Sequence, residues 1–73
     1  MMKKNIEELK VMYPVGITVV MDADMDDTNG VKTGHYGTVT DIDDAGTIHV
    51  SWDTGSHLGI IPGIDKFHKV NDD

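Results

Sequence analysis

The stretch DADMDDTNG places three aspartates, Asp22, Asp24 and Asp26, two residues apart. This is the spacing of the first carboxylate ligands in a calcium-binding EF-hand loop. Such a loop also needs a glycine at its sixth position and a bidentate glutamate at its twelfth. Here these positions hold Asp27 and Thr33, and strands rather than helices are expected on both sides. The pattern therefore favours a solvated acidic loop over a calcium site.

The sequence does not indicate a transition-metal site either. The four histidines show neither HxH nor HxxxH spacing, and the chain has no cysteine to act as a soft ligand. We therefore predict no cofactor and name no metal ligand. A metal-binding or metal-stabilised protein, with the acidic loop 22–27 as the source of ligands, is kept as the alternative function.

The combination of His49, Ser51 and Asp53 has the residue types of a catalytic relay. On one face of a strand these side chains would stand roughly 7 Å apart, which is too far for a hydrogen-bonded triad. Without another element folding over them they form no nucleophile and base. We therefore expect no enzymatic activity.

Composition narrows the class of protein further. A chain of 73 residues allows one small domain, and its 13 acidic residues against 6 lysines give a net charge of −7. Nucleic-acid binding rests on a basic face, which this chain cannot build. No segment approaches the roughly 20 apolar residues of a membrane span. We expect a soluble cytoplasmic monomer with no nucleic-acid or membrane partner, and the lack of cysteine suits a reducing compartment.

A short helix is predicted at the N-terminus. Asn5 is a plausible N-cap, with Glu8 at the third helical position as in a capping box, and Pro14 ends the helix. We assign residues 1–13 to this helix or extension and residues 14–73 to a β-barrel domain.

After the helix the chain changes to short β-branched runs separated by glycine and aspartate. In TIHVSWD, the residues Ile48, Val50 and Trp52 alternate with polar residues, so that one face is core. Val39 and Ile42 have opposite parity, which predicts a bulge near residues 40–41. The predicted strands are Ile17–Met21, Tyr36–Ile42, Thr47–Trp52, His57–Ile61 and Phe67–Val70.

The connections between these strands suggest the fold. DDAG and DTGS are short hairpin turns with glycine available for a positive φ, and PGIDK looks like one tight turn. In the second of these hairpins, a turn at Thr54 and Gly55 would place Trp52 opposite His57. Strand, long loop, strand, hairpin, strand, hairpin, strand, turn and strand is the plan of a five-stranded SH3-like barrel. The fold class predicted is all-β, with the short helix before the barrel.

Several motifs support this assignment: YPVG (13–16), MDD (25–27), GHYGTV (34–39), DDAGTIHVSWDTGSHLGIIPGID (43–65) and Phe67. Together they resemble an uncharacterised family of short bacterial and phage proteins, described as a domain of unknown function. The resemblance covers about residues 13–70 and implies an SH3-like barrel and genes often carried on phages or other mobile elements. It implies no activity, so no functional residue is transferred.

The remaining hypothesis is a small non-enzymatic protein-interaction module, acting as an accessory protein of a phage or mobile element. SH3-like barrels commonly bind peptides between their long first loop and a neighbouring hairpin. The acidic surface permits a basic protein partner. The residues expected at such a surface are Asp24, Asp26, Asp27, Tyr36, Trp52 and Asp53, although alternation turns the Trp52 ring inward.

Overall fold

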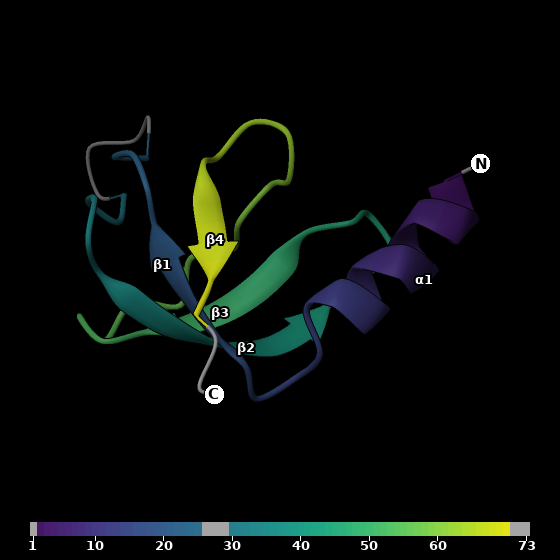
Figure 1. Cartoon of the computed structure of the whole chain (residues 1–73), viewed down its shortest axis with the longest axis horizontal. Helices are drawn as coiled ribbons and strands as arrows, with labels where there is room; N and C mark the ends of the chain where they lie inside the picture. The colour runs from purple at the N-terminus through teal and green to yellow at the C-terminus, as the bar shows by residue number, and fades with distance from the viewer. Residues whose placement is uncertain (1, 26–29, 71–73) are drawn as a thin grey trace.

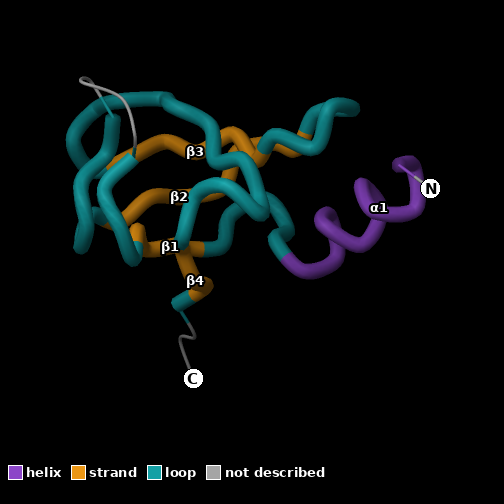
Figure 2. Tube along the Cα trace, turned by 90° about the horizontal axis from the view of Figure 1, so that it is seen from above, coloured by secondary structure: helices purple, strands orange, loops and turns teal. Residues whose placement is uncertain are grey.

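The computed structural model describes residues 2–25 and 30–70. It is mostly β, with one helix and one antiparallel sheet of four strands in the order β3-β2-β1-β4 (Figure 1). The helix extends away from one end of the strands (Figure 2). The elements are α1 (Met2–Met12), β1 (Thr18–Met21), β2 (Tyr36–Ile42), β3 (Ile48–Trp52) and β4 (Phe67–Lys69).

The sheet shows the predicted bulge. Strands β2 and β3 pair Val39 with Val50 and Asp41 with His49, so the register shifts between Val39 and Asp41. The extra residue lets both Val39 and Ile42 point into the core despite their opposite parity.

Alternation along β3 is also confirmed, because Ile48, Val50 and Trp52 are buried while the residues between them are half-exposed. Loop residues complete the core, with Val31 and Ile60 buried against the sheet. Among the described residues no polar or charged side chain is buried, so apolar packing alone builds this interior. The remaining buried apolar residues are Val19, Val20 and Met21 of β1.

Gly37 leaves room for the Trp52 ring beside β2. The two residues are register partners, and a Cβ built on Gly37 would lie 2.3 Å from Val50 Cγ1 and 2.6 Å from Trp52 Cε3. The indole Nε1 donates a hydrogen bond of 2.8 Å to the Leu58 carbonyl. Trp52 therefore ties β3 to the segment that follows it, and any side chain at position 37 would displace it.

The predicted strand at residues 57–61 is not formed. Ile60 makes an isolated bridge with Ile48, and the turn register is one residue shorter than expected because Trp52 N donates to the Ser56 carbonyl. At Gly59 the chain approaches so closely that a Cβ would lie 2.5 Å from Thr47 Cγ2. The segment is held by the two backbone hydrogen bonds between Ile48 and Ile60 and by side-chain hydrogen bonds such as that from Trp52, and these do not extend into a continuous ladder. The described strands consequently form an open four-stranded sheet, not the predicted five-stranded barrel.

The start of the helix also differs from the prediction. Asn5 lies inside α1, which begins at Met2, so it is not the N-cap. The methionine and lysines before it are good helix formers, and they extend the helix by a turn. The end agrees with the role given to Pro14, because a proline restricts the residue before it and lacks an N–H group. Within residues 2–25 and 30–70, no helix has the length and apolar character needed to cross a membrane.

Candidate functional site

One end of the sheet carries three of the predicted surface residues: Asp24, Tyr36 and Asp53. We call the surface that they form the loop face. The Asp53 carboxylate accepts hydrogen bonds from His35 Nδ1 at 3.0 Å and from the Tyr36 N–H at 3.1 Å. The Asp53 N–H in turn donates to the Tyr36 carbonyl at 2.8 Å. These bonds hold Asp53 beside Tyr36, whose side chain is half-exposed.

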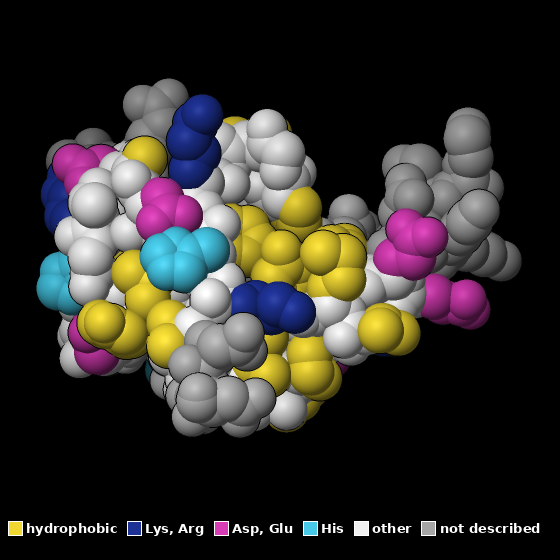
Figure 3. Space-filling view, in the orientation of Figure 1, with side chains coloured by type: hydrophobic (Ala, Val, Ile, Leu, Met, Phe, Trp, Pro, Cys, Tyr) yellow, Lys and Arg dark blue, Asp and Glu magenta, His cyan; other side chains and the backbone are white. Residues whose placement is uncertain are grey.

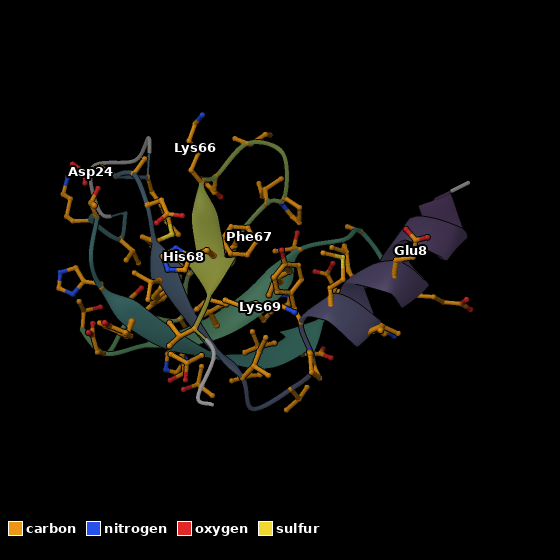
Figure 4. All side chains as sticks on the ribbon, in the orientation of Figure 1. Glu8, Asp24, Lys66, Phe67, His68 and Lys69 are labelled. Carbon is orange, nitrogen blue, oxygen red and sulfur yellow. The ribbon has the colours of Figure 1, made fainter. Side chains whose placement is uncertain are left out.

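Asp24 is held by a second local network. Its Oδ1 accepts hydrogen bonds of 2.8 Å from both the backbone N–H and the hydroxyl of Thr33. The backbone bond, followed by the hydroxyl bond, lowers the pKa of the Asp24 carboxyl below its ordinary value because both stabilise the charged form. Asp24 lies at the edge of the molecule opposite α1 (Figure 4).

The other predicted surface residues are less accessible or fall elsewhere. Trp52 is only 3% exposed, as the alternation predicted, so its ring belongs to the core and not to the surface. Asp26 and Asp27 lie outside the described residues. Tyr36 is therefore the exposed aromatic residue of the loop face.

Three histidine–aspartate pairs were not predicted from the sequence. They join His35 to Asp53 at 3.0 Å, His49 to Asp43 at 2.8 Å, and His68 to Asp22 at 2.7 Å. All six side chains are substantially exposed, so each pair contributes little to the free energy of unfolding. The hydrogen bond from His49, followed by the backbone bond from Thr47, lowers the pKa of the Asp43 carboxyl.

The side chains that were considered for a catalytic relay or a metal site bond to separate partners. His49 bonds to Asp43 and Asp53 bonds to His35, so neither is directed at Ser51 in a relay. In the acidic loop, Asp22 bonds to His68 while Asp24 bonds to Thr33. Among residues 2–25 and 30–70 no group of three or more histidine or acidic side chains could hold a metal ion.

The opposite end of the molecule has an apolar groove of about 550 Å³ between α1 and two loops, which we call the helix groove. Leu9 forms part of its floor, with Cδ1 lying 3.9 Å from a Cβ built on Gly46. Leu9 and Tyr13 pack against the core, and Tyr13 meets Phe67 with ring centroids 5.2 Å apart. The groove is lined by Ile6, Glu8, Leu9, Met12, Asp44, Ala45, Gly46, Ile61 and Pro62.

Large apolar side chains are exposed around the helix groove. Met12 on one wall and Ile61 on the other are 47% and 46% exposed, and both line the groove. Val11 is 81% exposed and lines a second hollow along α1 with Glu7 and Glu8. Hydrophobic side chains gather where the sheet meets the helix (Figure 3). Sequence reasoning missed this site, and the available signal was the unassigned apolar pair VM before Tyr13.

A comparison with known protein families identifies the family to which the chain belongs. A family model described as Domain of unknown function (DUF4314) matches residues 2–70, nearly the whole length. The chain belongs to this family. The DUF4314 match includes α1, which the motif resemblance from residue 13 onward did not cover, so the helix wall of the groove lies within the matched segment. No curated protein and no solved structure matches the chain.

Proposed function

We propose that this DUF4314 protein is a small protein-interaction module without enzymatic activity. The observation that carries the proposal is the helix groove, an apolar depression bordered by half-exposed Met12 and Ile61. Exposed apolar side chains that adjoin one another are typical of a surface that another protein covers. A partner that buried them would remove apolar area from water, which is the main driving force for association.

The loop face serves in this proposal as a charged contact for a basic partner. Asp24 and Asp53 are fixed by hydrogen bonds, so little conformational entropy is lost when a cation meets them. Tyr36 offers an exposed ring beside Asp53. The separate bonding of His49 and Asp53 supports the absence of catalysis at β3.

The finer predictions about context belong to this proposal as well. We propose a cytoplasmic monomer with an SH3-like fold, acting as an accessory protein of a phage or mobile element. The absence of cysteine supports the cytoplasm, and the motif resemblance supports the SH3-like fold and the mobile-element context. No observation on the described residues favours the metal-binding alternative over the interaction module.

Affinity capture from the native cell, followed by calorimetry with the purified candidate, tests the interaction module. We expect a saturable complex that Met12→Asp weakens about tenfold, because a charge would be buried against apolar atoms. Val15→Asp is the matched control, since Val15 is exposed and does not line the groove. A candidate that binds wild type, Met12→Asp and Asp53→Lys equally would contradict the proposed function, as would failure to capture any saturable partner.

A further inference from the structure

The charges around the helix groove specify what kind of partner fits it. Both charged residues that line it, Glu8 and Asp44, are acidic, and they lie on opposite walls. Glu7 and Glu8 also border the adjoining hollow with Val11 and Met12. Among the described residues that line either depression there is no lysine. The apolar floor is thus flanked by negative charge on both sides.

We infer that the helix groove binds an amphipathic segment of a protein partner that inserts apolar side chains between α1 and the 44–46 turn and carries lysine or arginine on both flanks. This inference rests on the proposed function and names the chemistry of the partner at the same site. The partner's apolar residues cover Leu9, Met12 and Ile61. Its basic residues face Glu8 and Asp44 across the rim.

Charge complementarity selects this occupant over a second copy of the chain. The protein has 13 acidic residues against 6 lysines, so two copies repel each other at an acidic rim. A basic segment is attracted to the same rim, which increases its association rate at low ionic strength. Glu8 belongs to α1 (Figure 4) and lines the groove together with Ile61 and Pro62.

The construction of the groove supports a segment that lies along α1. Ile6, Leu9 and Met12 follow each other at intervals of three residues and form one stripe on the helix. The facing wall is made of turns, Asp44–Gly46 and Ile61–Pro62, which leave the stripe open from the side. An amphipathic helix laid against such a stripe is a common form of peptide recognition.

Two synthetic peptides of about 15 residues test the inference, since shorter isolated helices are only marginally stable in water. One has leucine at helical i, i+3, i+4 and i+7 spacing with lysine at the polar positions; the other has glutamate in place of every lysine. Both are titrated into the ¹⁵N-labelled full chain. We expect the lysine peptide to shift the amide signals of residues 6–12, 44–46 and 61 saturably, and the glutamate peptide to leave them unchanged.

Variants then separate the apolar and the charged contributions. Met12→Asp should weaken binding of the lysine peptide about tenfold by placing a charge on the apolar wall. Glu8→Lys and Asp44→Lys should each weaken it about two- to fivefold, the range of an exposed ion pair, and the loss should shrink at high salt. Val15→Asp and Asp41→Lys are the matched controls, because neither residue lines the groove.

The outcomes separate this inference from the proposed function. Equal binding of both peptides at the groove overturns the inference that the partner segment is basic. The groove would then remain an apolar docking site. Shifts confined to the loop face, or no shift with either peptide, overturn the groove as the receptor of such segments, and the native-partner experiment still tests the interaction module. Concentration-dependent dimerisation that Met12→Asp abolishes assigns the groove to a second copy and overturns the inference.

Discussion

The loop face and the helix groove lie at opposite ends of β2, and they are stabilised by different means. At the loop face, hydrogen bonds fix the polar groups, as Asp53 bonds to His35 and Tyr36 and Asp24 bonds to Thr33. At the helix groove, α1 is attached through apolar contacts of Leu9 and Tyr13, while Met12 and Ile61 are left half-exposed. The first end is ordered by directional bonds, and the second is held by packing that a partner can extend.

This difference indicates which substitutions should destabilise the whole fold and which should act mainly on one element. Directional bonds between exposed groups contribute little to the free energy of unfolding, although they fix the positions of the groups that they join. Apolar contacts around an open groove contribute in proportion to the area they bury. We therefore expect core substitutions below the loop face to destabilise the whole fold, and substitutions below the groove to act mainly on the helix.

The largest expected effect is at Gly37, under the loop face. Gly37→Ala should lower the free energy of unfolding by about 3 kcal/mol, since its Cβ would overlap Val50 and Trp52. Gly46→Ala is the matched change at the groove, where φ is +88° but the nearest atom to a Cβ is 3.9 Å away. It should cost about 1 kcal/mol, from backbone strain alone. Urea unfolding followed by Trp52 fluorescence measures both, and equal losses would contradict the contrast.

The next effect concerns the attachment of the helix. Leu9→Ala should cost about 1 to 2 kcal/mol, because a half-buried side chain loses part of its packing. Helical ellipticity in far-UV circular dichroism should fall while Trp52 fluorescence keeps its native maximum, since Leu9 packs on the outside of the core and is not one of its buried residues. Val11→Thr serves as the control with no expected change, as Val11 is 81% exposed and the two residues have similar helix propensities. Simultaneous loss of both signals would show that the two ends unfold together.

A smaller effect is expected at the loop face itself. Asp53→Asn should cost less than about 1 kcal/mol, because His35 and Tyr36 donate to different carboxylate oxygens and the amide keeps only one acceptor oxygen. NMR should show changes at the amides of His35 and Tyr36, with the groove amides unchanged. Asp41→Asn provides a comparison on an exposed carboxylate of β2. Changes that reach residues 44–46 would instead mean that the two faces are coupled.

The smallest effect is the response to acid. The pKa of Asp24 and Asp43 is lowered from 3.8 in the folded chain, so both carboxyls stabilise the fold above that value. This stabilisation is lost as pH falls below 3.8 and through the lower folded pKa values. Urea midpoints measured across this range should decline less steeply in Asp24→Asn and Asp43→Asn than in wild type. An unchanged slope in both variants would refute the assignment.

Local patterns were sufficient to predict much of the sheet. Alternation in TIHVSWD identified the buried face of β3, and the parity of Val39 and Ile42 located the bulge. The segment 57–61 was assigned wrongly as a strand, because β-branched composition does not reveal that Gly59 packs against Thr47. The helix began earlier than predicted, since a plausible capping residue is also tolerated inside a helix when good helix formers precede it.

The two candidate surfaces also differed in how well local sequence patterns predicted them. Asp24, Tyr36 and Asp53 stood out because acidic and aromatic residues near a long loop are a recognisable pattern. The helix groove did not stand out, because its walls come from three separate segments of the chain. Each segment alone contains ordinary apolar residues, and nothing local indicates that they meet.

By itself, the sequence determined the chemical limits of this protein: an acidic, cysteine-free chain with a β-rich pattern and a short N-terminal helix. These properties depend on composition and on the period of apolar residues, which are local quantities. Only the tertiary structure decided that Gly37 leaves room for the Trp52 ring, that three histidines pair with aspartates, and that α1 stands beside the 44–46 turn with a groove between them. Those arrangements depend on distances between residues far apart in the chain, and only the packed fold sets them.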